Sequence, residues 1–265
     1  VVGFGPAGMF AALVLAKAGL QPLVLERGKC VEERKKDVLD FWENGILHTD
    51  SNIQFGEGGA GTFSDGKLTT GIKDSRIRFI LETFVACGAP SEILYLAKPH
   101  IGTDYLEQVV KNIRCQIQEL GGEILFSARF MGYQTDEQGS LKSISYEKEG
   151  SIREQQTQHC ILAIGHSARD TFQVLYDEGI PMQAKSFVSC SMIKISHSNR
   201  KILQWVSELN IYNLTSIKVC MEHLPNSYQQ RIISSLFICH LVMTYIHSVC
   251  VRAEMLLRQH LKKVI

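Results

Sequence analysis

The chain has 265 residues, of which 45% are hydrophobic and 21% are charged, so it is neither an intrinsically disordered protein nor a small disulfide-stabilised one. Its 28 Lys and Arg residues balance its 27 Asp and Glu residues to a net charge of +1, which argues against a nucleic-acid partner or an anionic membrane surface. The eight Cys residues show no Cys-x-x-Cys pair and no zinc-binding spacing, so we expect reduced thiols, no bound metal and a cytoplasmic location.

The first elements are a strand, a glycine turn, a helix and a second strand. Val1-Val2 ends an apolar strand, Gly3–Gly8 follows the pattern G-x-G-x-x-G, and a helix is predicted over Met9–Ala18, closed by Gly19. A buried strand over Leu23–Glu26 then ends in an acid. Because a strand normally needs about five residues, we expect the N-terminus to be clipped.

This order of elements is that of a dinucleotide-binding unit. Gly3 permits the tight turn, Gly5 lets the backbone approach a pyrophosphate, and Gly8 lets the helix pack closely on the strand. The N-terminus of the helix offers free N–H groups and a positive dipole end to phosphates. Glu26 lies where a carboxylate can accept both ribose hydroxyls of an adenosine, and its charge disfavours a 2′-phosphate. NADP is therefore the least expected ligand of this first site.

Several segments resemble known flavoproteins. Gly3–Gly8, with Pro6-Ala7 inside it, and Leu25–Gly28 resemble the FAD-binding start of the two-dinucleotide-binding-domain flavoproteins. Three longer segments resemble parts of a bacterial family of uncharacterised FAD-dependent dehydrogenases, and these segments are Asn52–Leu68, Lys98–Asp104 and Ala163–Thr171. The resemblance covers about residues 1–185.

The resemblance implies an α/β fold: a Rossmann-like FAD-binding domain over residues 1–186, with a parallel sheet and an antiparallel β-meander. Part of a second domain is expected as an insertion at about residues 70–120. The implied cofactor is FAD, with NAD(P)H as a candidate electron donor and a small-molecule substrate that the sequence does not identify. The candidate cofactor-binding residues are Gly3, Gly5, Pro6, Ala7, Gly8, Glu26, Arg27, Gly58, Gly59, Ala60, Gly61, Lys67, Phe130, Ala163 and Gly165.

The segment Gly56–Gly61 is too glycine-rich for a buried element. It can bring several backbone N–H groups close to a flat polar ring or a phosphate. Lys67 could place a positive charge near a reduced flavin. The alternative is a surface loop with a solvated lysine.

Helices are predicted over Cys30–Asn44, Asp74–Cys87 and Thr103–Leu120, and short strands of a meander over Glu123–Phe130, Gly132–Thr135, Leu141–Lys148 and Ile152–Gln156. A buried strand, Cys160–Gly165, then returns to the parallel sheet. It carries Ile164 where the flavoprotein pattern usually has Thr, which removes a hydroxyl but keeps the backbone approach. A helix is predicted to begin with His166, Arg169 and Asp170, and Asp170 favours its N-terminal dipole. His100 and His166 are candidates for acid–base groups, with loop hydrogen bonding as the alternative.

Residues 180–265 form a different kind of sequence, with no Gly in 86 residues. One allowed codon choice for Tyr245–Val264, read in a shifted frame, gives HSFCMCPGGDVVAAASEEG, which resembles a Cys-x-Cys-Pro-Gly-Gly segment of the same family. We therefore interpret residues 187–265 as an irregular or helical tail read out of frame. The alternatives are a membrane helix over the uncharged run Ile232–Val251 and a genuine divergent domain.

The leading functional hypothesis is an FAD-dependent oxidoreductase, a dehydrogenase or reductase, whose chain is incomplete and whose own activity is uncertain. The alternatives are a non-catalytic remnant with weak or no FAD binding, a flavoprotein tethered to a membrane by residues 232–251, and a simple dehydrogenase that holds NAD at the first site. We expect no membrane attachment under the leading hypothesis.

Overall fold

The computed structural model describes residues 1–63, 66, 68, 74, 76–97, 99–180 and 182. Lys67 and the tail 187–265, with its apolar run 232–251, lie outside the described residues. The helices and strands in chain order are α1 (Pro6–Lys17), β1 (Leu23–Leu25), α2 (Val31–Asn44), a 3₁₀ turn (Gly59–Phe63), α3 (Arg76–Ala86), a second 3₁₀ turn (Ser91–Leu94), α4 (Thr103–Glu119), β2 (Glu123–Leu125), β3 (Ala128–Thr135), β4 (Leu141–Lys148), β5 (Ser151–Gln156) and α5 (Arg169–Asp177).

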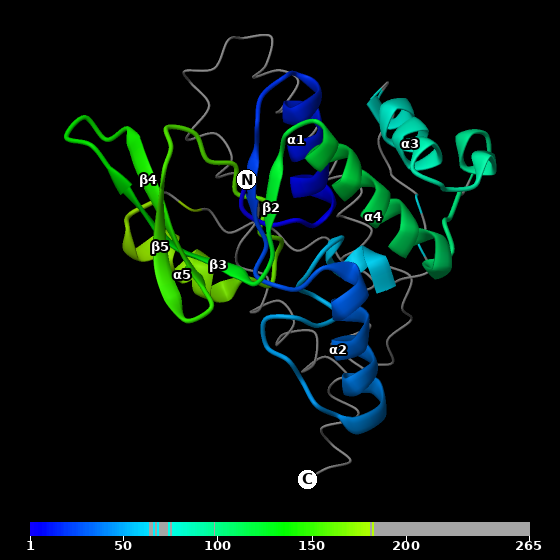
Figure 1. Cartoon of the computed structure of the whole chain (residues 1–265), viewed down its shortest axis with the longest axis horizontal. Helices are drawn as coiled ribbons and strands as arrows, with labels where there is room; N and C mark the ends of the chain where they lie inside the picture. Colours follow the sequence, from blue (N-terminus) through cyan, green and yellow to red (C-terminus); the bar gives the residue numbers. More distant parts are fainter. Residues whose placement is uncertain are drawn as a thin grey trace, which may run out of the picture.

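A parallel sheet occupies the centre of the described chain (Figure 1). β1 and β2 pair in parallel, with Leu23 opposite Glu123. Val2 bridges Leu25 on one side and Leu162 on the other, both in parallel. The order across the sheet is therefore β2, β1, the N-terminal segment and the segment around Leu162. The prediction of an α/β fold with a parallel sheet and an antiparallel meander is confirmed.

Apolar faces of α1, α3 and α4 pack together with the sheet and form the main hydrophobic core (Figure 1). This burial is the largest favourable contribution to folding. Fully or almost fully buried side chains of this core include Phe4, Leu13, Val24, Val109, Ile113, Ile117 and Ile124.

α1 begins at Pro6, three residues before the predicted start. Proline is accepted at the first helical position because its missing N–H has no partner there. Gly5 is the N-cap residue and has extended backbone, and no side chain caps the helix. The helix ends as predicted, with Gly19 in the left-handed region at φ +79°.

The predicted strand Glu123–Phe130 is wrong as a single element. It divides at Ser127, which has φ +50°. The N–H of Ser127 donates to the carbonyl of Gly28, and the next N–H, of Ala128, donates to the carbonyl of Glu26. These bonds turn the chain out of the parallel sheet, so β2 stays in that sheet and β3 begins the meander. β3 then continues through Gly132 with a bulge, so no separate strand starts there.

The meander is a three-stranded antiparallel sheet in the order β3, β4, β5. α5 packs on β3, with Leu175 buried against a second core that contains Phe130, Ile144 and Tyr146 (Figure 1). The helix begins at Arg169, so His166 lies before it rather than in it.

No helix in the described ranges is long and apolar enough to cross a membrane.

Candidate functional site

A cavity opens at the carboxyl ends of the parallel strands, between the glycine turn, the loop at Gln54–Ala60 and the segment that leads to α5. Eleven of the predicted cofactor residues line it, namely Gly3, Gly5, Pro6, Ala7, Glu26, Arg27, Gly59, Ala60, Phe130, Ala163 and Gly165. Three described ones do not line it, and they are Gly8, Gly58 and Gly61. The structure thus brings eleven of the predicted residues together around one cavity. This cavity lies at the edge where open α/β sheets bind their ligands.

Phe55 and Thr171 also line the cavity, although the sequence did not single them out, and so does Gly56, the first residue of the glycine-rich segment. Each lies inside a segment that carries the family resemblance, Asn52–Leu68 or Ala163–Thr171. The family resemblance therefore covered these residues, but it did not distinguish them from their neighbours in the same segments.

The glycine turn brings three backbone segments into contact. A Cβ on Gly3 would lie 2.4 Å from the carbonyl oxygen of Ala163, and a Cβ on Gly8 would lie 1.8 Å from the carbonyl oxygen of Gly3. These two glycines therefore serve close packing of the turn. Gly5 differs, because a Cβ there would meet only the Cα of Gly59, at 3.7 Å.

The N-terminus of α1 faces this cavity, since Gly5, Pro6 and Ala7 line it and no side chain caps the helix. Backbone N–H groups and the helix dipole make such an end a binding site for anions.

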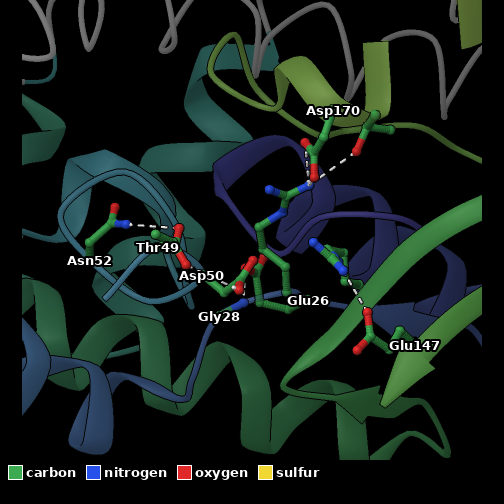
Figure 2. Close-up of polar contacts among 10 residues, drawn as sticks. Glu26, Gly28, Thr49, Asp50, Asn52, Glu147 and Asp170 are labelled. Atoms are coloured by element: carbon green, nitrogen blue, oxygen red, sulfur yellow. Dashed lines mark hydrogen bonds and ion pairs between the residues drawn. The ribbon is translucent and has the colours of Figure 1, made fainter. Parts of the chain in front are cut away.

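Glu26 ties the glycine turn to two other segments. Its Oε2 accepts the N–H of Phe4 at 2.7 Å, and its Oε1 accepts the N–H groups of Gly28 at 2.9 Å and Gly56 at 3.0 Å. Figure 2 shows the contact with Gly28. A carboxylate has about four acceptor positions, so these bonds leave room at Oε2 for one further donor. The sequence did not foresee this structural role, and the contact with ribose stays a prediction.

Arg27 joins the end of β1 to the start of α5. Its Nη2 donates to both carboxylate oxygens of Asp170, at 2.8 and 2.9 Å, and to the hydroxyl of Thr171 at 3.1 Å (Figure 2). The guanidinium also lies 4.6 Å from the centre of the Phe55 ring. Burial alone would raise the pKa of the Asp170 carboxyl, but Arg27 outweighs it and lowers the pKa. Asp170 therefore does more than favour the helix dipole, because it holds Arg27, which lines the cavity together with Thr171.

The expectation that Gly56–Gly61 is too glycine-rich to be buried is wrong for its first part. Gly56, Glu57 and Gly58 are buried. The burial is possible because Arg34 donates to the carbonyl oxygens of this loop, which would otherwise lose their water without a partner.

Glu57 is a carboxylate with no exposed surface. Its Oε2 accepts the N–H of Val31 at 2.8 Å and lies 3.2 Å from Nη1 of Arg114. Within the described chain, its Oε1 has no hydrogen-bond partner. Burial raises the pKa of Glu57 to about 7, and it outweighs the lowering by Val31, Arg114 and Arg34.

Because its pKa is raised on folding, Glu57 should make the stability of the protein depend on pH. Between its ordinary pKa of 4.5 and about 7, the folded chain keeps a proton that the unfolded chain has lost. The free energy of unfolding should therefore fall as pH rises through this window, by roughly 3 kcal/mol at about 1.4 kcal/mol per pKa unit. Glu32, whose pKa is lowered to about 2, is ionised in both states above about pH 5.5 and adds no slope there, whereas below that pH it adds a slope of the opposite sign.

Urea denaturation from pH 4.5 to about pH 8 measures this slope in the wild type and in Glu57→Gln. Glu57→Gln has a neutral amide and should remove most of the pH dependence of the free energy of unfolding. Glu33→Gln, at an exposed position of α2, should leave this pH dependence unchanged. An unchanged slope in Glu57→Gln would contradict the assignment.

The two candidate acid–base histidines differ in position. His166 lines the cavity, with its Nε2 3.1 Å from the hydroxyl of Ser167, whereas His100 is exposed and does not line it. No group of three or more His, Cys, Asp or Glu in the described residues is arranged to hold a metal ion. Cys30, Cys87 and Cys115 form no disulfide.

No family model matches the chain. A protein of Clostridium beijerinckii without an assigned function is 52% identical over 187 residues, which cover 71% of this chain and 34% of the relative. The chain thus spans about a third of the length of the curated relative that it matches.

Solved structures with some likeness include THI4 of Thermovibrio ammonificans, at 15% identity and a TM-score of 0.46 over 68% of this chain and 61% of that one. The 3-ketosteroid-Δ4-(5α)-dehydrogenase of Rhodococcus jostii RHA1 has 17% identity and a TM-score of 0.42 over 62% and 44%. Aklavinone-11 hydroxylase, solved with FAD and aklavinone, has 16% identity and a TM-score of 0.36 over 69% and 34%.

Proposed function

We propose that the chain is the dinucleotide-binding part of an FAD-dependent oxidoreductase. The observation that carries the proposal is the meeting of Gly5, the uncapped N-terminus of α1 and Glu26 around one cavity at the carboxyl ends of parallel strands. An anionic pyrophosphate suits the helix end, and the adenosine ribose suits the remaining acceptor position of Glu26.

The residues that line the cavity fit the pyrophosphate and the ribose of FAD, but the cavity is narrow. It encloses about 80 Å³, whereas ligand pockets usually measure roughly 300–1,000 Å³. A Cβ on Gly59 would lie 3.2 Å from the Cα of Gly5, so the loop and the turn nearly touch. When a dinucleotide binds, the contact between Gly59 and Gly5 therefore has to open, whereas the preceding part of the loop stays hydrogen-bonded through Gly56 to Glu26 and through Gly58 to Phe4.

When bound, FAD supplies the acceptor for a hydride, and the protein contributes binding and electrostatics. Within this proposal the N–H groups of α1 hold the pyrophosphate, Glu26 orients the ribose, and Arg27 closes the cavity beside it. NAD(P)H as electron donor, the small-molecule substrate, a role for Lys67 and a cytoplasmic location belong to the same proposal. The charge of Glu26 disfavours a 2′-phosphate at this site.

A second candidate is a protein that binds FAD without transferring a hydride. It is favoured by the small volume of the cavity, about 80 Å³, which leaves little room for a substrate beside the cofactor.

Titration of the purified full chain with FAD, followed by quenching of flavin fluorescence, tests the binding. We expect saturable binding that ADP inhibits in competition and that 2′-phospho-ADP inhibits at least tenfold less. Addition of NADH or NADPH without oxygen then separates the two candidates, because bleaching of the flavin absorbance requires hydride transfer. Absence of saturable binding would overturn the proposed function.

A further inference from the structure

Arg34 is a cation with no exposed surface, although it lies on α2 and does not line the cavity. Charged side chains are rarely buried completely unless hydrogen bonds and neighbouring charges replace the lost water. The partners of Arg34 should therefore explain why a charged side chain is buried at this position.

Its guanidinium donates to three backbone carbonyls of one loop. Nε donates to the carbonyl of Asn52 at 2.8 Å, Nη2 to that of Ile53 at 2.9 Å, and Nη1 to that of Glu57 at 2.6 Å. The planar group also lies 4.9 Å from the centre of the Phe63 ring. Only a planar fork of donors meets several fixed acceptors in this way, and a lysine ammonium lacks that geometry.

Gly56 lies between these carbonyls in the sequence, and its backbone packs closely against the aliphatic part of the Arg34 side chain. It has φ +121°, and a Cβ there would lie 2.4 Å from Cδ of Arg34. From this position its N–H donates to Glu26, and two residues later the N–H of Gly58 donates to the carbonyl of Phe4 at 2.9 Å. The loop is thus fixed by Arg34 on one side and by the glycine turn on the other.

We propose that Arg34 is a positioning residue of the dinucleotide site, which holds Asn52–Glu57 so that Gly56 and Gly59 face Gly5 across the cavity. The inference rests on the proposed function and extends it to a residue that touches no ligand. Arg34 acts through the loop: without its three hydrogen bonds, the loop no longer holds Gly56 beside Glu26 and Gly58 beside Phe4.

A purely electrostatic role is the alternative. Arg34 faces Glu57, and Glu32 and Arg114 complete the charged groups around that carboxylate. If Arg34 only balanced this charge, Arg34→Lys would preserve the site. If the fork positions the loop, Arg34→Lys would keep the charge and still lose the site.

The test compares Arg34→Lys with Arg78→Lys, the same substitution at a mostly exposed position of α3. Hydrogen exchange of the Gly56 and Gly58 amides is measured without FAD, and FAD affinity is measured by fluorescence. We expect Arg34→Lys to speed exchange of both amides at least tenfold and to weaken FAD binding at least tenfold. The Leu13 amide in α1 should keep its exchange rate, and Arg78→Lys should match the wild type.

Unchanged exchange at Gly56, or faster exchange with the same FAD affinity as Arg78→Lys, would overturn the inference. If Arg34→Lys does not fold, Phe63→Leu removes the ring beneath the guanidinium and should produce the same two changes in smaller measure; no change in that variant would also overturn it. If the wild type binds no FAD, the proposed function fails, and the exchange rates still decide whether Arg34 fixes the loop.

Discussion

Gly8→Ala is expected to destabilise the protein by at least about 3 kcal/mol, more than Ala substitutions for most glycines. The new methyl group would lie 1.8 Å from the carbonyl oxygen of Gly3. The oxygen belongs to the backbone of the turn, and the methyl carbon is bonded directly to the backbone of α1, so no flexible side chain can rotate away from the contact. Overpacking of a buried site typically costs 1–3 kcal/mol, and a contact with backbone lies at or above the upper end.

Gly5→Ala provides the matched control, because it adds the same methyl group three residues earlier. There the methyl group would meet only the Cα of Gly59, at 3.7 Å, and the backbone already has an extended conformation. We expect the free energy of unfolding to change by less than about 0.5 kcal/mol. FAD affinity should nevertheless fall at least tenfold, because the methyl group occupies the approach of the pyrophosphate.

Urea denaturation followed by circular dichroism gives the two stabilities, and flavin fluorescence gives the affinity. Equal stability of Gly8→Ala and wild type would show that α1 does not pack on the turn as described. Full FAD affinity in Gly5→Ala would count against the phosphate position in the proposed function.

Glu26→Ala is expected to cost about 3–5 kcal/mol of stability even in the absence of a ligand. The substitution removes the acceptor of three N–H groups, from Phe4, Gly28 and Gly56, and Glu26 itself is only 5% exposed. A buried donor without a partner costs about 1–3 kcal/mol, and partial access of water reduces the sum. The loss should appear as a lower midpoint of urea denaturation.

Glu43→Ala, at an exposed position of α2, controls for the loss of a carboxylate and should stay within about 0.5 kcal/mol of the wild type. A change in Glu26→Ala as small as in this control would refute the structural role of Glu26. Because that role precedes any ligand, loss of FAD binding in Glu26→Ala would not by itself demonstrate a contact with ribose.

The glycine turn, α1 and the acid at the end of β1 could be predicted because their signals are local. Gly3, Gly8 and Glu26 lie within one short stretch of chain, and the almost uniformly apolar sequence of α1 is typical of a helix that is buried on most sides. The cavity at the end of the parallel strands follows from the same pattern, since a helix between two parallel strands places its N-terminus there.

What the sequence by itself determined is therefore the α/β fold of the first part and the position of the candidate site. Only the tertiary structure decided which side chains build that site. Arg27 pairs with Asp170 across 143 residues, and Arg34 hydrogen-bonds a loop that the sequence left exposed. The hydrogen bond from Ser127 to the distant Gly28 likewise divides the strand that the sequence predicted as one element. These outcomes depend on which backbone groups lose water when distant segments pack, and no local pattern of residue types records that.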